Sequence, residues 1–385
     1  MGQQPCLGIG SPLADAVSTW RGFGFGPVTD KDSSQGWSQS LGLLWGVSCM
    51  QGWRDSMEDA HLAIPHLHGW RDTAVFGVMD GHGGEQVARF CEQHLPQELA
   101  RRGNQDVPVA LTSAFHQMDV LLADPRSLHE LRALSRMPKG AASPPPHPDL
   151  VGCTAIVCCV RRDTITVANA GDCRAVLCRR GRAVDMSEDH KPNLPAEAAR
   201  IQRAGGCVLP QRLPLGNLYR VNGDLSLSRA IGDLRYKQNP RLGPQEQIVS
   251  CTPDVRTFGR QPDDEFMIVA CDGVWDVMSS QQAVDYVRQR LLPLLEGSVK
   301  PSTVAEGLLD NCLSPDPAKT FGLGGDNMTL LIVVFQGGPE EMVVMPRRIP
   351  VGATMRPGPG AAATMRPGPG AAAPYATAAA GSCLA

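Results

Sequence analysis

Short apolar runs separated by turn residues recur between positions 43 and 335 and predict a series of β-strands. Apolar runs of this length, bounded by Gly, Asn and Asp, are typical of strands buried in a sheet. Several neighbouring runs are joined by tight turns, which favours antiparallel pairing over parallel strands with crossover helices. The expected strands are 43–49, 74–79, 151–160, 164–170, 174–179, 266–271 and 328–335.

Helical spacing of apolar residues appears in three segments, 84–102, 110–122 and 279–295. In the third, Val284, Val287 and Leu291 recur three or four positions apart, and Ser279 can cap the start. Helices and antiparallel strands together predict an α+β protein.

Composition divides the chain into one folded domain and two terminal segments. Residues 1–42 are rich in Gly and Ser without a sustained period, so we expect a flexible leader. Residues 136–148 contain three consecutive prolines, which predicts an exposed irregular insert. Residues 336–385 are dominated by Pro, Gly and Ala and repeat one decapeptide, which predicts a disordered tail. The domain is therefore expected at 43–335.

Charge and hydropathy exclude some classes of function. The 36 basic and 39 acidic side chains leave a net charge of −3, which argues against nonspecific nucleic-acid binding. No stretch approaches the ~18 apolar residues of a transmembrane segment. The 13 cysteines are an odd number and lie mostly in apolar runs, which favours buried thiols in a reducing compartment. We expect a monomeric cytoplasmic protein, with the nucleus as a second location.

The candidate chemistry lies at strand ends. Asp80-Gly81 and Asp272-Gly273 each follow an apolar run, and Asp326 precedes another. An isolated Asp-Gly step is more often a hairpin turn than a metal ligand. These steps do not stand alone, however, because further acidic residues and a histidine lie near them in the sequence: Glu58, Asp59, His82 and Asp276. The clustering favours a site for divalent cations, which prefer oxygen ligands.

Two such cations could activate a water for attack on phosphorus, so no protein nucleophile would be required. The carbonyl of Gly81 would be accessible to a metal because no side chain shields it. His82 could protonate the leaving group as a general acid, and Arg54 could bind a phosphate through its fork of donors. The sequence therefore predicts a metal-dependent hydrolase.

Seven ordered motifs resemble those of the type 2C metal-dependent serine/threonine protein phosphatases, with most similarity to the animal alpha and beta branch. The motifs are 50–61 (MQGWRDSMEDAH), 79–84 (MDGHGG), 152–155 (GCTA), 169–174 (NAGDCR), 221–233 (VNGDLSLSRAIGD), 271–276 (CDGVWD) and 325–329 (GDNMT). The resemblance implies a four-layer αββα sandwich of two antiparallel sheets flanked by helices, with two Mg²⁺ or Mn²⁺ ions at one end.

The resemblance also implies roles for individual residues. Arg54 would hold the phosphate, His82 would be the acid and Thr154 would support the site, while a flap over 190–250 would contribute to substrate choice. The metal ligands would be Asp80, which bridges both ions, then Gly81, Asp272 and Asp326, with Glu58 and Asp59 close by or acting through water. Asp172 and Asp276 would serve a third, weakly bound metal.

These expectations lead to a phosphatase that hydrolyses phosphoserine and phosphothreonine in phosphoprotein substrates. A catalytically silent phosphoprotein-binding module on the same scaffold is the alternative, because Cys153, Cys173 and Asp224 depart from the usual family residues. A two-metal nuclease and a calcium module are weaker alternatives. Gly2 permits N-myristoylation, although Cys6 stands where Ser or Thr is favoured, and one acyl chain would bind a membrane only marginally.

Overall fold

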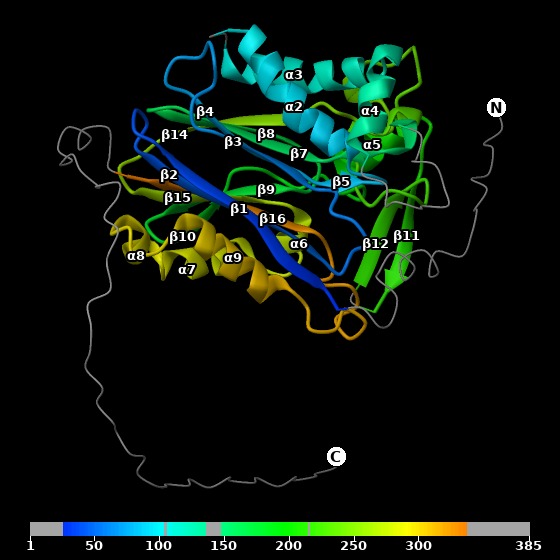
Figure 1. The fold of residues 1–385 in the computed structure, drawn as a ribbon. Helices are drawn as coiled ribbons and strands as arrows, with labels where there is room; N and C mark the ends of the chain where they lie inside the picture. Colours follow the sequence, from blue (N-terminus) through cyan, green and yellow to red (C-terminus); the bar gives the residue numbers. More distant parts are fainter. Residues whose placement is uncertain (1–25, 104–105, 136–147, 215, 337–385) are drawn as a thin grey trace, which may run out of the picture. The chain divides into compact units, whose positions relative to one another are not determined.

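Two antiparallel β-sheets lie face to face in the computed structural model, which describes residues 26–103, 106–135, 148–214 and 216–336 (Figure 1). The six-stranded sheet has the order β1 (Val28–Ser38), β2 (Leu43–Gly52), β16 (Met328–Phe335), β15 (Asp264–Ala270), β9 (Arg174–Arg179) and β10 (Arg182–Asp185). The five-stranded sheet has the order β14 (Asp254–Gly259), β8 (Thr164–Ala170), β7 (Ala155–Val160), β4 (Ala74–Met79) and β3 (Ala60–Ile64).

The core between the sheets is built from the inward-facing side chains of both. Val47 of β2 and Met267 of β15 lie in one buried cluster with Phe76 of β4 and Ile156 of β7, and none of the four is exposed to solvent. Alternation along a strand sends the neighbouring side chains to the outer faces, where they meet helices. This explains why the central strands are apolar at nearly every position.

Helices cover both outer faces, which completes the four layers (Figure 1). On the five-stranded sheet lie α2 (Gln86–Arg101) and α3 (Val107–Leu122), with η1 (Pro125–Ser127) and α4 (Leu128–Leu134) following them. On the six-stranded sheet lie α6 (Asp272–Trp275), α7 (Ser280–Arg288), α8 (Leu291–Leu295) and α9 (Pro301–Cys312). The predicted αββα sandwich is confirmed.

Two small sheets extend from the sandwich. β5 (Gly81–His82) pairs with β6 (Gly152–Cys153), which pairs with β13 (Ile231–Gly232). Within the predicted flap, 190–250, the elements are α5 (Pro195–Arg203), the hairpin of β11 (Val208–Leu213) and β12 (Gly216–Val221), and the short helices η3 (Leu234–Tyr236) and η4 (Pro244–Glu246). A further short helix, η2 (Pro148–Leu150), precedes β6.

Most predicted elements are confirmed, and the strands at 74–79, 164–170, 174–179 and 328–335 have the expected bounds. The expected leader over 1–42 is wrong for Val28–Ser38, which form β1 and pair with β2. This edge strand is mostly polar, so its hydrogen bonds to β2 leave no hydrophobic pattern in the sequence. Gly2, most of the insert (136–147) and the tail from 337 lie outside the described residues. Among the described helices, none is long and apolar enough to cross a membrane.

Candidate metal and phosphate site

The acidic residues collect at one end of the sandwich because strand ends from both sheets meet there. Asp59 precedes β3 and Asp80 follows β4, and these two strands pair antiparallel in one sheet. Asp272 follows β15 and Asp326 precedes β16, which pair in the other sheet. Antiparallel pairing places the end of one strand beside the start of its partner, so each sheet delivers two carboxylates.

A cleft of about 400 Å³ opens at this end. Eight of the residues proposed from the sequence line it: Arg54, Glu58, Gly81, His82, Asp80, Asp172, Asp272 and Asp326. Ser226 and Leu227, from the predicted flap, line it as well. The structure therefore joins the strand-end carboxylates, the arginine and the histidine in one cleft, while Asp59, Thr154 and Asp276 lie outside its lining.

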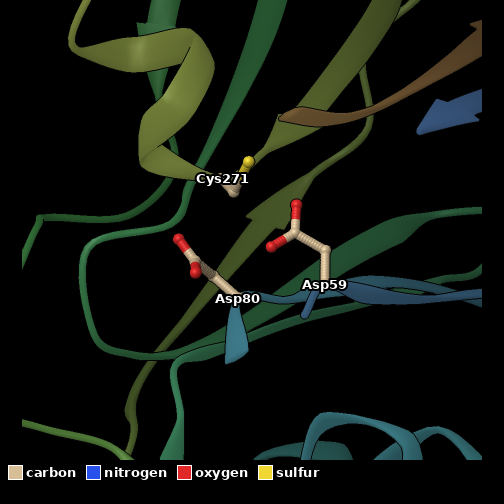
Figure 2. Close-up of side chains that lie close together, drawn as sticks. All are labelled: Asp59, Asp80 and Cys271. Atoms are coloured by element: carbon tan, nitrogen blue, oxygen red, sulfur yellow. The ribbon is translucent and has the colours of Figure 1, made fainter. Parts of the chain in front are cut away.

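Asp80, which lines the cleft, and Asp59, which does not, both approach the thiol of Cys271 (Figure 2). One ligand atom from each of the three residues lies within 4.8 Å of the other two. The Asp59 Oδ2 accepts a 2.7 Å hydrogen bond from the Thr329 hydroxyl, whereas its buried Oδ1 has no hydrogen-bond partner among the described residues. A buried carboxylate oxygen without a partner is costly unless a cation or water satisfies it.

The electrostatics of these carboxylates suit a bound cation. Burial raises the pKa of Asp59 to about 7, and the charge of Asp326 adds to the increase. Burial also raises the pKa of Asp80 and of Asp272 well above its ordinary value, and charges of neighbouring carboxylates raise both further. Several acidic groups that repel one another in a partly buried cleft fit the hard oxygen donors preferred by Mg²⁺ and Mn²⁺.

Cys271 does not fit the role of a ligand for these metals. Burial raises the pKa of its thiol well above the ordinary value, which keeps it protonated. Its sulfur accepts the backbone N–H of Thr329 at 3.2 Å and lies 3.6 Å from the carbonyl of Asn327. A neutral thiol is a poor donor for a hard cation. Cys271 instead belongs to the buried core between the two sheets.

Arg54 contacts Asp326, one of the carboxylates proposed as metal ligands. Its Nη2 donates a 2.6 Å hydrogen bond to Oδ2 of Asp326, and both side chains are about 38% exposed. The buried Nε of Arg54 has no hydrogen-bond partner among the described residues. Arg54 lines the cleft, so its guanidinium lies where a phosphate would bind under the role expected from the sequence.

His82 lies against a carboxylate that the sequence did not single out. Its Nε2 is 2.7 Å from Oδ2 of Asp233, a residue buried completely. Burial lowers the pKa of His82, but the Asp233 carboxylate outweighs this effect and holds the pKa above its ordinary value. Gly152 leaves room for the pair, because a Cβ there would lie 2.3 Å from Asp233 Oδ2 and 2.7 Å from His82 Nε2.

Asn327 fixes the segment that carries Arg54 and Glu58. Its side-chain amide donates to the carbonyls of Gln51 and Ser56, at 2.8 and 2.9 Å, and its Oδ1 accepts the N–H of Glu58 at 2.9 Å. The only sequence signal for Asn327 is its place directly after a proposed metal ligand in the quoted motif. It holds the 51–58 segment against the start of β16.

Two hydrogen bonds, one from Ser56 and one from Gly84, orient the Glu58 side chain. Its carboxylate accepts the Ser56 hydroxyl at 2.7 Å and the N–H of Gly84 at 2.9 Å. Gly81 must stay small here, because a Cβ would lie 2.2 Å from the Glu58 carbonyl oxygen. Because Glu58 and Gly81 approach so closely, Glu58 lines the cleft together with Asp80.

Asp172 and Asp276, predicted for a third metal, have different surroundings. Asp172 is buried and receives a 2.6 Å hydrogen bond from the ammonium of Lys191, a residue the sequence did not single out. Asp276 is exposed and lies one turn after Asp272, whose carbonyl accepts its N–H. Thr154 donates its N–H to the Asp80 carbonyl at 2.9 Å, which supports the strand end behind the cleft.

Asp224 is engaged within the flap region. Its carboxylate accepts hydrogen bonds from Arg235 and, at 2.7 Å, from the Tyr236 hydroxyl. Its negative charge is therefore balanced by Arg235.

Comparison with known proteins places this fold and site in a family. The model of the family described as protein phosphatase 2C matches residues 44–320. A rice protein, "Probable protein phosphatase 2C 11", is 40% identical over 341 residues, covering 80% of this chain and 89% of its own. "Protein phosphatase 2C homolog 2" of fission yeast is 42% identical over 322 residues, covering 81% and 78%. The chain belongs to the protein phosphatase 2C family.

Solved structures agree on the fold. The "Crystal structure of a phosphatase from a pathogenic strain Toxoplasma gondii" has a TM-score of 0.61 at 25% identity, covering 80% of this chain and 96% of that one. The "Crystal structure of serine-threonine phosphatase 2C from Toxoplasma gondii" has the same TM-score at 22% identity, with 80% and 99% covered. The family and the cleft together define a protein phosphatase.

Proposed function

We propose that the protein hydrolyses phosphoserine and phosphothreonine in phosphoproteins, using two bound Mg²⁺ or Mn²⁺ ions. The observation that carries the proposal is the set of strand-end carboxylates facing Arg54 and His82 across one cleft. Asp80, Asp272, Asp326 and the Gly81 carbonyl would hold the ions, with Glu58 and Asp59 beside them. When bound, such ions supply an acidic water as nucleophile and neutralise the charge of the phosphate.

The chain's own groups position the phosphate and handle the proton. The guanidinium of Arg54 would exchange its contact with Asp326 for the phosphate oxygens, because a planar fork matches two oxygens at once. His82, protonated and held by Asp233, would donate its proton to the departing serine or threonine oxygen. Leu227 and Ser226 of the flap region would contact the residues around the phosphorylated side chain.

The test is phosphate release from a phosphothreonine peptide by the full chain, with Mn²⁺ or with chelator. We expect release only with the metal, and loss of release in Asp272→Asn. The matched control is Asp263→Asn, which removes a half-buried carboxylate paired with Arg180, outside the cleft lining. A folded protein that releases no phosphate would instead support the silent phosphoprotein-binding module.

Other expectations from the sequence are part of this proposal. The substrates would be phosphoproteins, the protein would act as a monomer, and its location would be cytoplasmic or nuclear. Gly2 acylation would add a weak membrane anchor. Assignment to the animal alpha and beta branch also stays a prediction, since the relatives reported above come from a plant and a yeast.

A further inference from the structure

Lys191 places a permanent positive charge inside the acidic cluster. Its Nζ lies 2.6 Å from Oδ2 of Asp172, whose side chain is 3% exposed, while the lysine side chain is 33% exposed. The charges of Asp172, Asp272 and Asp276 all act on the ammonium, and its charge acts in return on Asp272 and Asp276. The ammonium therefore lies among the carboxylates expected to hold a third cation.

Hydrogen bonds of the preceding residue, His190, hold the backbone at Lys191 beside Asp172. The N–H of His190 donates to the carbonyl of Gly171 at 2.9 Å, directly before Asp172 in the chain. The carbonyl of His190 accepts the N–H of Ser228 at 3.2 Å and its hydroxyl at 3.1 Å. Pro192 follows Lys191 and restricts it to extended backbone. The lysine backbone is thus fixed beside Asp172, and only the side chain is free to move.

We propose that the Lys191 ammonium is the resident cation at Asp172, and that a third divalent cation binds there only by displacing it. The inference rests on the proposed function and deepens it, because it states what sets the metal affinity of this end of the cleft. A divalent ion must break the Lys191–Asp172 contact and tolerate the nearby positive charge until the side chain turns away. The 33% exposure of the side chain gives it a route to solvent.

The first test is direct Mn²⁺ binding to the full chain, measured by equilibrium dialysis without substrate. Lys191→Met keeps an unbranched apolar stem and removes the charge, so we expect its weakest Mn²⁺ site to bind at least about 10-fold tighter than in the wild type. Lys191→Arg keeps the charge and should retain the weak site. Lys31→Met is the matched control, because Lys31 forms a 2.6 Å pair with Asp310 between β1 and α9, outside the cleft lining.

The second test needs no variant. Acylation of lysines by acetic anhydride, mapped by mass spectrometry, should label Lys191 more strongly as Mn²⁺ is raised into the millimolar range, because the displaced amine reaches solvent. Lys31 should show no such increase. Unchanged Mn²⁺ affinity in Lys191→Met, or labelling of Lys191 that stays constant or falls with Mn²⁺, would overturn the inference.

The outcomes separate this inference from the proposed function. If the wild type lacks two tight Mn²⁺ sites, the dinuclear proposal fails. A site that tightens in Lys191→Met relative to the wild type would still support displacement of the lysine. Conversely, two tight sites with identical weak binding in both proteins would leave the phosphatase proposal intact and reject the role of Lys191.

Discussion

His82 Nε2 and Asp233 Oδ2 lie 2.7 Å apart, although the two residues are separated by 151 positions in the chain. Asp233 is completely buried and adopts a left-handed backbone conformation, with φ of 50°. Non-glycine residues in this conformation are strained and are kept where the surroundings demand them. The pair therefore holds the His82 ring in one orientation at the cleft.

Asp233→Asn should lower kcat for a phosphothreonine peptide by roughly 10- to 100-fold, because general acids contribute about that much or more. The loss should be much smaller with p-nitrophenyl phosphate, whose leaving group does not need a proton. Steady-state kinetics on both substrates measure the difference. In a His82→Ala background, the second substitution should add little; an equal loss on both substrates would indicate a merely structural role.

Arg54→Lys should reduce kcat/KM for the peptide by roughly 10- to 100-fold, since a charge-assisted hydrogen bond contributes about 1.5–3 kcal/mol. An ammonium cannot reproduce the fork that Arg54 presents beside Asp326. Arg126→Lys serves as control, because Arg126 is paired with Asp124 at the surface. Steady-state kinetics of the two variants, measured side by side, test this prediction. Unaltered kinetics in Arg54→Lys would show that Arg54 does not bind the phosphate.

Asn327→Ala should destabilise the protein by about 2–3 kcal/mol, because three half-buried hydrogen bonds to the 51–58 segment are lost. Its KM should rise as well, since Arg54 lies on that segment. Urea unfolding and peptide kinetics measure both effects. Asn311→Ala, which removes one exposed hydrogen bond to Gly307, should change stability by less than about 0.5 kcal/mol.

The metal-free protein should lose stability as the pH rises. Asp59 has a pKa of about 7 in the fold against an ordinary 3.8, so between these values the folded state binds a proton that the unfolded state has released. The free energy of unfolding should therefore fall from about pH 4 to about pH 7 and then level off, by a few kcal/mol. Urea unfolding in chelator at pH 5.5 and 8 measures the slope.

Two controls isolate this effect. Asp59→Asn should flatten the slope, and saturating Mn²⁺ should reverse the loss at pH 8, because the cation stabilises the ionised carboxylates. Carboxylates in ion pairs affect stability only at lower pH. For example, ion pairs with Arg200 and Arg229 lower the pKa of Glu197 to about 2 despite its burial. A slope that persists in Asp59→Asn would assign the pH dependence to other groups.

Local sequence patterns predict many strands of the two sheets and the carboxylates that line the cleft. Strands such as 74–79 and 328–335 were readable because buried strands carry apolar residues at nearly every position. Asp80, Asp272 and Asp326 could be proposed as metal ligands because they lie at the ends of apolar runs, where the chain leaves the sheet. Local patterns of this kind lie within a few residues and need no knowledge of distant partners.

The partners of those residues could be identified only once the fold had brought distant segments together. β1 was missed because its stability comes from backbone hydrogen bonds to β2, which do not depend on apolar side chains. Asp233, Asn327 and Lys191 were not predicted because their roles depend on contacts with other segments of the chain, namely His82, residues 51–58 and Asp172. Such contacts leave no periodicity in the sequence: they arise when packing of the two sheets brings the strand ends together and buried polar groups must find partners.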